Sequence, residues 1–540
     1  MVKKILAALL AAAMVFALVA CNSTPAGNDT TAAPEETKAT EETKEDTTAA
    51  PAEEDTTAEP AAETDAPSGD KVKITIFRCL YNLSVVDDAQ VKKVQDKLNQ
   101  MLDEKGSNVE VEIKEIHNSE YSDKASLALA NNEINLLWNS SWWGGGIGCD
   151  DVWRAGAAYD ITDLLPGTAL WDSMPEAVWE ASKYDGKVLF IPVYKETYEG
   201  YDMKTTQYAI DQTGHDPEFP EVQAGADWYE KMAAFGTFLG ECKDAGIKYP
   251  YLSSVFYYRI ALDDYDFFTG SNALCCVDRK TGEVVEGVAT EGYRKWCKLM
   301  GDWADAGYIH EDCIAKAVPS GVSQTEDWGL QFWTNVPGDS EKNSEERDGI
   351  DEVLILGLTD WYTHSTTTLG SCYTVTSNCT EEQAKACIEF LGYIYTDPAF
   401  GDVYTFGIEG EDYTIDANGR VHKEEGCKYN HAAWESTSVA GLTLLDSEPE
   451  DKIESYDKNN NAAKTSIAAG FRFDKTPVEA QYAACNDLYS QYGEPLELGA
   501  YPASEVDAVV DEYLAKLDAA GYQDVLAEAQ KQYKEWSESK

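Results

Sequence analysis

Two adjacent tryptophans, Trp142 and Trp143, follow Ser141 and precede three glycines at 144–146. They lie outside any amphipathic pattern, and exposed aromatic side chains of this kind indicate a contact surface. Indole faces pack against the C–H faces of sugars, and the hydroxyl of Ser141 offers both a donor and an acceptor to sugar hydroxyls. We therefore expect at least one indole to face a ligand. The alternative is that one of the two is simply buried.

The segments before these tryptophans predict a βαβαβ unit. Residues 74–77, 109–113 and 134–138 have the apolar patterns of strands, and residues 91–102 and 121–131 have helical spacing. In open parallel sheets, ligands bind beyond the carboxyl ends of the strands. Tyr81, which follows the first strand, and the loop 139–146, which follows the third, are therefore expected to line one crevice.

The amino-terminal region predicts secretion and anchoring. Lys3 and Lys4 precede an apolar stretch at 5–20, which is short for a membrane span, and small residues lead to Cys21. The string Leu-Val-Ala-Cys ending at Cys21 resembles the lipobox of bacterial lipoproteins, which implies a signal peptide at 1–20 and a lipidated Cys21. An ordinary secretory signal with an incidental cysteine is the alternative. Residues 22–70 consist almost wholly of Thr, Ala, Glu, Asp and Pro, which predicts a disordered tether or an O-glycosylated stalk.

Composition excludes several classes of function. The 540 residues contain 97 acidic and 43 basic side chains, a formal net charge of −54, which excludes nucleic acid as a partner. The thirteen cysteines form no CxxC pair and the six histidines no HExxH or zinc-ribbon spacing, so no metal site and no cofactor are predicted. The disulfide state of the twelve cysteines after Cys21 is left open, because both oxidised and reduced forms fit the sequence.

The rest of the chain continues to alternate between predicted strands and helices. Residues 188–193 and 329–334 predict strands, and 229–245 and 292–306 predict helices. Thr380-Glu381-Glu382-Gln383 forms a capping box at the start of a helix that Asp397-Pro398 ends. Residues 504–536 predict two amphipathic helices with a break at Gly521.

Four stretches are similar to the extracellular solute-binding proteins of ABC importers, specifically the family 1 sugar-binding lipoproteins of Gram-positive bacteria. Residues 184–192 resemble the family's Asp-Gly-Lys, strand and proline segment, and 377–398 resemble its polar turn, capped helix and Thr-Asp-Pro. Residues 406–413 resemble the YGIEGxxY motif of one lipoprotein subgroup, with Phe406 in place of the first tyrosine. The Gly-Phe-Arg-Phe-Asp at 470–474, with 516–521 and 528–536, resembles the subgroup's carboxyl-terminal end.

This resemblance implies an α/β, two-lobe fold of the periplasmic-binding-protein type (type II), with discontinuous lobes joined by a multi-segment hinge. We expect residues 71–194 plus 362–405 to form lobe 1 and residues 195–361 plus 406–540 to form lobe 2. Crossings between the lobes are expected near 192–198, 360–370 and 405–411. Such lobes open and close around a ligand held between them.

The resemblance also suggests which residues line the cleft. Glu196 and Tyr198 follow the first crossing, where a carboxylate can accept two hydroxyl protons; a solvated hinge charge is the alternative for Glu196. Tyr257, Trp333 and Phe471 fall in regions that line the cleft in similar proteins, and Trp361 lies beside a crossing. Arg472 has two open roles, binding hydroxyls or a uronate and forming an interlobe salt bridge. For Trp333, the alternative is that its ring caps a hydrophobic core.

The predicted function is therefore capture of a sugar or oligosaccharide and its delivery to the permease subunits of an ABC transporter. The protein would be a monomer, held at the extracellular face of the cell membrane by its lipid alone, and would not be an enzyme. Two alternatives remain: the same fold with a peptide or other polar solute, and a surface glycoside hydrolase using Asp263, Asp264 and Asp266.

Overall fold

The computed structural model describes residues 71–81, 86–215, 227–269, 272–319, 321–334, 349–355, 358–364, 366–424 and 426–540. The predicted leader, the lipidated Cys21 and the tether lie outside the described residues. In the part of the chain that is described, no helix combines the length and the apolar character needed to cross a membrane. The cysteines from Cys79 to Cys485 that the structure describes are all free thiols.

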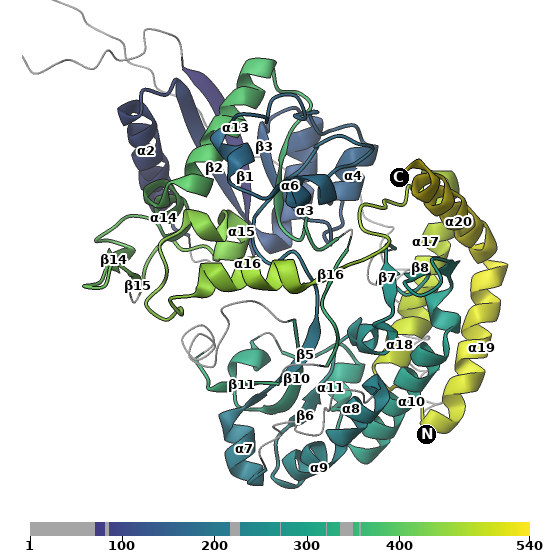
Figure 1. Cartoon of the computed structure of the whole chain (residues 1–540). Helices are drawn as coiled ribbons and strands as arrows, with labels where there is room; N and C mark the ends of the chain where they lie inside the picture. Colours follow the sequence, from purple (N-terminus) through teal and green to yellow (C-terminus); the bar gives the residue numbers. More distant parts are fainter. Residues whose placement is uncertain are drawn as a thin grey trace, which may run out of the picture. The chain divides into compact units, whose positions relative to one another are not determined.

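The first sheet has five strands in the order β2-β1-β3-β13-β4. Figure 1 labels its strands β1, β2 and β3. β1 (Val72–Leu80) is parallel to β2 (Val109–His117) and β3 (Leu136–Asn139), which confirms the predicted βαβαβ unit. β13 (Cys372–Val375) lies antiparallel between β3 and β4 (Ile191–Pro192). Because this late strand completes a sheet that the first strands began, the lobe is discontinuous in sequence. We call this sheet and its helices the first lobe.

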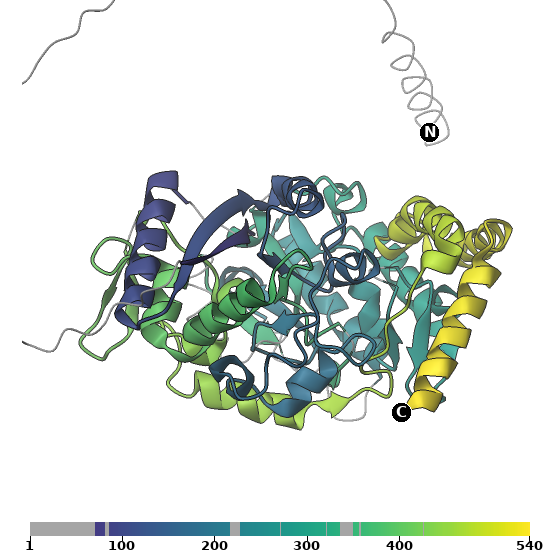
Figure 2. The ribbon, with the colours of Figure 1, turned by 90° about the horizontal axis from the view of Figure 1, so that it is seen from above.

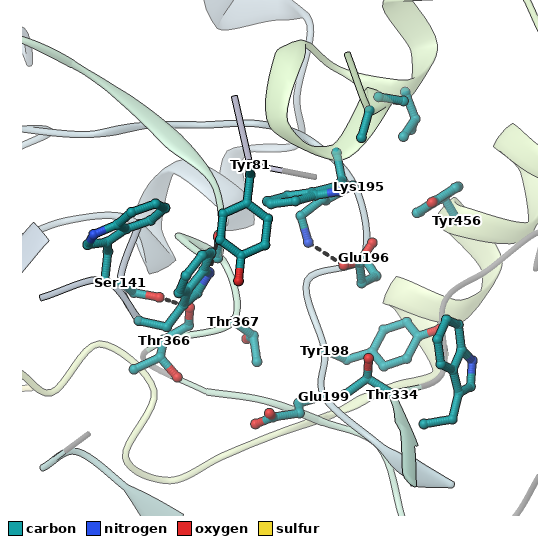
Figure 3. Close-up of a pocket in the computed structure, with 18 of the residues that line it drawn as sticks. Tyr81, Ser141, Lys195, Glu196, Tyr198, Glu199, Thr334, Thr366, Thr367 and Tyr456 are labelled. Carbon is teal, nitrogen blue, oxygen red and sulfur yellow. Dashed lines mark hydrogen bonds and ion pairs between the residues drawn. The ribbon is translucent and has the colours of Figure 1, made fainter. Parts of the chain in front are cut away.

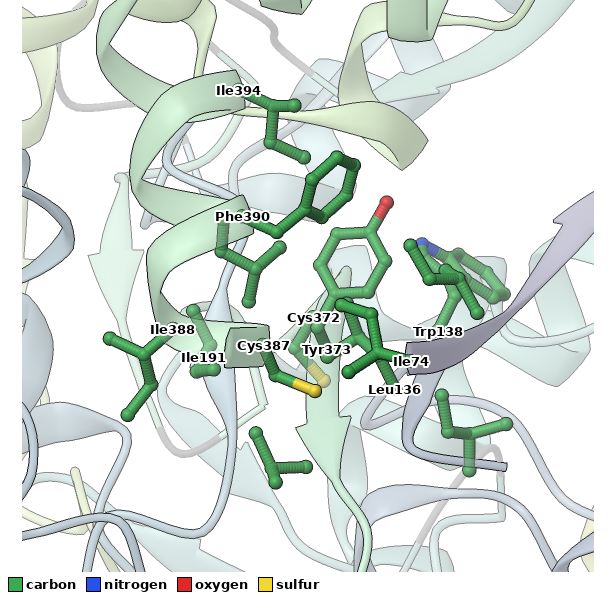
Figure 4. Packing of buried hydrophobic residues seen from close by; sticks show 14 of the residues in the cluster. Ile74, Leu136, Trp138, Ile191, Cys372, Tyr373, Cys387, Ile388, Phe390 and Ile394 are labelled. Atoms are coloured by element: carbon green, nitrogen blue, oxygen red, sulfur yellow. The ribbon is translucent and has the colours of Figure 1, made fainter. Parts of the chain in front are cut away.

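Helices cover the first sheet and bury its core. In α13, Thr380 caps the helix and Gln383 completes the predicted capping box. Phe390 and Ile394 of α13 pack with Ile74 and Tyr373 of the sheet in one buried cluster (Figure 4). The helices of this lobe are α2 (Asp88–Glu104), α3 (Asn118–Ala130), α4 (Cys149–Arg154), α5 (Ala169–Asp172), α6 (Glu176–Ala181), α13 (Glu381–Thr396) and α14 (Pro398–Phe406).

The second sheet has four strands in the order β11-β5-β10-β6, and with its helices it forms the second lobe. Its strands are β5 (Tyr201–Thr206), β6 (Tyr249–Leu252), β10 (Trp328–Thr334) and β11 (Glu352–Ile355), and a smaller sheet joins β7 (Tyr265–Phe267), β8 (Cys276–Asp278) and β9 (Val284–Val285). Its helices are α7 (Gln207–Thr213), α8 (Trp228–Ala234), α9 (Gly236–Asp244), α10 (Glu291–Ala306) and α11 (Glu311–Ile314).

The carboxyl-terminal helices pack on the second lobe. α19 (Ala503–Ala519) contacts α10, and α20 (Tyr522–Ser539) contacts α17 (Glu479–Leu488) and α19 (Figures 1 and 2). A short helix, α18 (Glu494–Glu497), precedes them. Gly521 separates α19 from α20 with a φ of 91°, a backbone conformation that suits glycine, so the predicted break is confirmed.

In the described part of the chain, three segments cross between the lobes and pair with one another. The backbone of Glu199 exchanges hydrogen bonds of 2.9 and 3.0 Å with that of Tyr362. β12 (Tyr362–Thr363) then pairs in parallel with β16 (Lys464–Thr465), which supplies the third crossing.

Residues 405–411, where the sequence predicts a third crossing, instead pack on the first lobe. Asp412 accepts a 2.6 Å hydrogen bond from the Gln90 amide of α2 and a 2.9 Å bond from the nitrogen of Ile408, so the chain turns back after α14. Segments that the predicted boundaries placed in lobe 2 thus contact the first lobe. Residues 406–465 contain β14 (Tyr413–Ile415), β15 (Val421–Lys423), α15 (Ala433–Ser436), α16 (Lys452–Ala462) and β16.

Candidate functional site

A cavity of about 1780 Å³ is lined by side chains of both lobes and of the first crossing segment. Figure 3 shows part of its lining, with Tyr81 and Ser141 on one side and Tyr198, Glu199 and Thr334 on another. Eight of the eleven residues predicted from the sequence line this cavity: Tyr81, Ser141, Trp142, Trp143, Glu196, Tyr198, Tyr257 and Trp333.

The loop after β3 holds the two tryptophans in place. The nitrogen of Cys149 donates to the Ser140 carbonyl at 3.1 Å, which closes the loop on itself. Gly148 lies against the Trp143 carbonyl in this loop, and a Cβ at this position would overlap the carbonyl oxygen. The Trp142 indole donates to the Gly370 carbonyl at 2.6 Å, and the Trp143 indole donates to the Ser122 hydroxyl at 2.7 Å. Both N–H groups are therefore satisfied by protein, and the ring faces remain for other contacts.

Four aromatic rings form one wall of the cavity. Tyr81 contacts Trp142, Trp143 and Trp434 edge to face, with centroid distances of 5.4, 5.6 and 5.5 Å. Trp142 is 49% exposed, which leaves a large apolar surface open to the cavity. Ser141 is fixed beside these rings by a 2.6 Å hydrogen bond from its hydroxyl to the Thr366 carbonyl (Figure 3). We call Tyr81, Trp142, Trp143 and Trp434 the first aromatic wall.

The first crossing segment carries charged and aromatic groups into the cavity. Glu196 forms an ion pair with Lys195, and both line the cavity (Figure 3). Asn460 of α16 anchors this segment, because its side chain accepts from the nitrogen of Thr197 at 2.9 Å and donates to the carbonyl of Lys195 at 3.0 Å. The carboxylate of Glu196 is thus held at the junction of the lobes, where it can accept hydrogen bonds from a polar ligand.

Glu199 also lines the cavity and is held by partners far away in the sequence. His364 contacts its carboxylate at 2.8 Å, and Arg259 lies 3.7 Å from it. Burial alone would raise the pKa of Glu199, but the hydrogen bond and charge of His364 and the charge of Arg259 lower the pKa to about 2. The carboxylate is therefore ionised across the physiological range, and it links the crossing segments to the second lobe.

Four further rings form a second aromatic wall on the second lobe. Tyr257 stacks on Phe332 with a centroid distance of 4.3 Å, and Phe256 meets Phe332 edge to face at 5.8 Å. Trp333 also lines the cavity, with the Lys204 ammonium 4.5 Å from its ring centroid. Lys204 is in turn paired with the buried Glu352 at 2.5 Å. We call Phe256, Tyr257, Phe332 and Trp333 the second aromatic wall.

The three other predicted residues do not line the cavity. Trp361 stacks on Tyr198 with a centroid distance of 4.9 Å and so supports a lining residue from behind. Phe471 is buried against Phe268, Tyr533 and Trp536 in the core of the second lobe. The Arg472 guanidinium lies 4.5 Å from the Tyr184 ring centroid and donates to the Ala181 carbonyl at 3.4 Å. It therefore makes a contact between the lobes.

Several lining residues were not predicted from the sequence. Trp434, Glu199 and Phe332 were missed, as were residues 442–448, which also line the cavity. Trp434 carries a weak signal, since it is a tryptophan in a short segment without helical periodicity, as Trp142 is. Glu199 was not identifiable, because its partners Arg259 and His364 are distant in the sequence.

The carboxylates nominated for hydrolysis are not part of the cavity lining. Asp266 is paired with Arg279 at 2.7 Å, and Asp264 with Lys280 at 2.5 Å. Asp263 accepts a hydrogen bond from the nitrogen of Asp360 at 3.3 Å. Among the described residues, no group of three or more His, Cys, Asp or Glu side chains is placed to hold a metal ion. The cavity thus presents ring faces, carboxylates and hydroxyls, which are groups that bind a polar solute with apolar faces.

Comparison with solved structures identifies the fold. The N-glycan transport solute binding protein NgtS from Streptococcus pneumoniae is similar with a TM-score of 0.73 and 20% identity, over 87% of this chain and 99% of that chain. The alginate-binding protein AlgQ2 is similar with a TM-score of 0.55 and 14% identity, over 86% of this chain and 99% of that one. The chain has the fold of the solute-binding proteins. The predicted α/β, two-lobe architecture is thereby confirmed.

Sequence comparison points in the same direction. The chain is 23% identical over 396 residues to a carbohydrate ABC transporter substrate-binding protein of Streptococcus pneumoniae serotype 4, over 72% of this chain and 77% of the relative. Residues 467–538 match a family described as a domain of unknown function, DUF3502. These residues include α17 to α19 and all but the last residue of α20, the helices that pack on the second lobe.

Proposed function

We propose that this protein captures an oligosaccharide between its two lobes as the extracellular substrate-binding protein of an ABC importer. The observation that carries this proposal is the pair of aromatic walls, one on each lobe, that line a single cavity together with Glu196 and Glu199. Sugar rings present apolar C–H faces and polar edges, so a site that combines ring faces with carboxylates matches both parts of the ligand.

The size of the cavity favours an oligosaccharide over a single sugar. Sites for small ligands occupy about 300–1,000 Å³, whereas this cavity measures about 1780 Å³. The first and second aromatic walls provide several stacking positions, which suits a chain of sugar units. NgtS, to which the chain is similar, has been solved with Man1GlcNAc, and this supports an oligosaccharide as the class of ligand.

Binding would work through a change in the balance between open and closed lobes. A ligand stabilises the closed state only to the extent that it binds that state more tightly than the open one. Rings on both lobes satisfy this condition, because a sugar that touches both walls loses contacts when the lobes separate. The closed protein would then deliver the sugar to permease subunits, without covalent chemistry and as a monomer. Cys21 would carry the lipid that holds it at the outer face of the cell membrane.

A thermal-shift screen of the purified protein against oligosaccharides tests this proposal, followed by chemical analysis of the sugar after incubation. A ligand that binds only the folded state raises the melting temperature. We expect a reproducible shift with at least one oligosaccharide, and the sugar should be recovered intact. Cleaved sugar would indicate a glycoside hydrolase instead. A shift with peptides but with no sugar would show that the cargo is of another class.

A further inference from the structure

The segment 467–538 contributes directly to the cavity. Phe473, Lys475 and Tyr482 are among the lining residues, although the buried side chains of α17 to α20 belong to the core of the second lobe. Behind the lining, Glu497 at the end of α18 contacts a loop that carries part of the second aromatic wall. The segment therefore contributes to the cavity in two ways, through its own lining residues and through the buried contact of Glu497 with that loop.

Glu497 is a buried carboxyl group with defined partners. Its side chain is fully buried, and its two oxygens accept hydrogen bonds from the Tyr293 hydroxyl at 3.1 Å and the Tyr489 hydroxyl at 3.0 Å. The same oxygen that accepts from Tyr489 also accepts from the backbone nitrogen of Phe256 at 3.3 Å. A buried carboxyl group without such donors would be strongly unfavourable, so these contacts fix its position.

Phe256 has an unusual backbone conformation. Its φ is 64° and its ψ is −6°, in the left-handed region, where a bulky side chain is a genuine outlier. Such residues persist only where the surrounding structure holds them, and they gather at ligand-binding sites. The hydrogen bond from the Phe256 nitrogen to Glu497 supplies this constraint. The carbonyl of Phe256 in turn accepts from the nitrogen of Arg259 at 3.1 Å.

The conformation of Phe256 decides where two rings of the cavity lie. The chain turns at Phe256 into the 3₁₀ helix Tyr257–Leu262, and this turn brings the Phe256 and Tyr257 rings to a centroid distance of 5.2 Å. Both rings contact Phe332 and line the cavity. Arg259 in the same turn lies 3.7 Å from Glu199 of the first crossing. One short loop thus connects Glu497, the second aromatic wall and the hinge.

We propose that Glu497 is a positioning residue for ligand binding, which holds Phe256 in its left-handed conformation and so builds part of the second aromatic wall. The segment 467–538 thereby acquires a role in setting ligand affinity. This inference deepens the proposed function and rests on it for the identity of the ligand. Its structural half, the restraint of the loop 253–262, does not depend on any ligand.

The raised pKa of Glu497 makes glutamine its closest neutral substitute. Burial raises the pKa of Glu497 to about 8 against the hydrogen bonds that lower it, and the nearby charge of Glu494 adds to the rise. Tyr293 and Tyr489 are its hydroxyl hydrogen-bond partners, and Tyr258, Tyr513 and Cys297 also lie close enough to interact with its charge. Glu497 is therefore mostly neutral near pH 7, and in that form its protonated oxygen donates to the tyrosine hydroxyl that it faces in place of accepting from it. A glutamine amide keeps the size, the neutrality and an oxygen that can face the Phe256 nitrogen.

The experiment compares Glu497→Leu, Glu497→Gln and the control Glu528→Gln in the full chain. Glu528 pairs with Lys531 and Gln532 on α20 and is absent from the cavity lining. We measure the Kd for the oligosaccharide found in the screen and the hydrogen exchange of the peptide spanning 253–262. E497L should weaken binding about tenfold and should lose protection in that peptide, while E497Q and E528Q should keep wild-type values within about threefold.

A double-mutant cycle with Phe256→Ala separates positioning from general destabilisation. If Glu497 acts through Phe256, E497L will weaken binding far less in the F256A background than in wild type, because the ring that it positions is already absent. Equal losses in both backgrounds would overturn the proposal. If E497L does not fold, Glu497→Asp replaces it, since the shorter side chain withdraws the carboxyl from the Phe256 nitrogen; wild-type exchange and affinity in E497D would overturn the proposal.

The design also distinguishes failure of this inference from failure of the proposed function. If wild-type protein binds no oligosaccharide, the proposed function fails, and hydrogen exchange alone decides the inference. Loss of protection at 253–262 in E497L, with the rest of the second lobe unchanged, supports Glu497 as the restraint. Unchanged protection in that peptide overturns it, whatever the protein binds.

Discussion

Replacing Trp142 by alanine tests the first aromatic wall most directly. The indole is held by its 2.6 Å bond to the Gly370 carbonyl and contacts Tyr81 and Trp143, yet 49% of the side chain is exposed. Because its N–H already has a protein partner, a ligand would contact the ring face. The substitution therefore removes apolar ligand contact and leaves the hydroxyl and carboxylate groups of the cavity in place.

The magnitude follows from the exposed surface. A large aromatic side chain buries about 150–250 Å² when fully covered, so about 100 Å² of Trp142 remains for a ligand to cover. At about 25 cal/mol per Å², full coverage gains about 2.5 kcal/mol, and coverage of less than half gains about 1 kcal/mol. We therefore expect Trp142→Ala to weaken oligosaccharide binding about 5- to 70-fold. The lost hydrogen bond to Gly370 costs about 1 kcal/mol of folding stability, which leaves the protein folded.

Isothermal titration calorimetry with the oligosaccharide from the screen measures this change, with two control variants. Trp142→Phe keeps a ring face and should retain most of the affinity. Leu127→Ala removes an apolar side chain that is 65% exposed on α3 and is not part of the cavity lining, so it should bind as wild type. If W142A melts as a folded protein and binds the sugar as tightly as wild type, stacking on Trp142 is refuted.

Three further predictions concern two residues of the first crossing segment, Glu196 and Gly200, and the buried Glu497. Glu196→Gln should weaken oligosaccharide binding about 10- to 100-fold, because hydrogen bonds to a charged group contribute about 1.5–3 kcal/mol; calorimetry that finds unchanged affinity would exclude Glu196 from the site. Gly200→Ala should destabilise the protein by about 1–3 kcal/mol, since a Cβ there would overlap the Trp361 ring, whereas Gly236→Ala, with open space around it, should not; urea denaturation of both variants checks this contrast. Burial raises the pKa of Glu497 to about 8, above the value of about 4.3 in an unfolded chain, so its contribution to stability is complete below about pH 4.3 and is lost as the pH rises through about 8. E497Q should lack this loss, and its unfolding free energy relative to wild type should rise between pH 5 and pH 9; equal changes in both proteins would show that Glu497 does not titrate in this range.

Local patterns in the sequence predicted most of the fold. The capping box at Thr380, the proline at the end of α13 and the glycine between α19 and α20 each act over a few residues, so they are visible in a single sequence. The third crossing was not predictable in this way. β16 consists of Lys464 and Thr465 alone, and its pairing with β12 depends on tertiary contacts and not on any periodicity.

The candidate site was partly predictable for the same reason. Trp142 and Trp143 stood out because no helical or strand pattern explained them. Phe471 also looked like a cavity residue, but core and cavity both favour aromatic rings, and here the ring is buried against Tyr533 and Trp536. Glu497 gave no signal, because its importance comes from a hydrogen bond to Phe256 across a large separation in sequence.

The position of β13 within the first sheet constrains the order in which the chain can fold. β3 and β4 pair with β13 and not with each other, so both keep an unpaired edge until residues 372–375 have been synthesised. The core of the second lobe is completed later still, because it includes residues of α19 and α20 near the end of the chain. Contacts between such distant segments form slowly, since a long loop must close before they can be made. A chain that stops before β13 therefore leaves both lobes incomplete, with open sheet edges that favour aggregation.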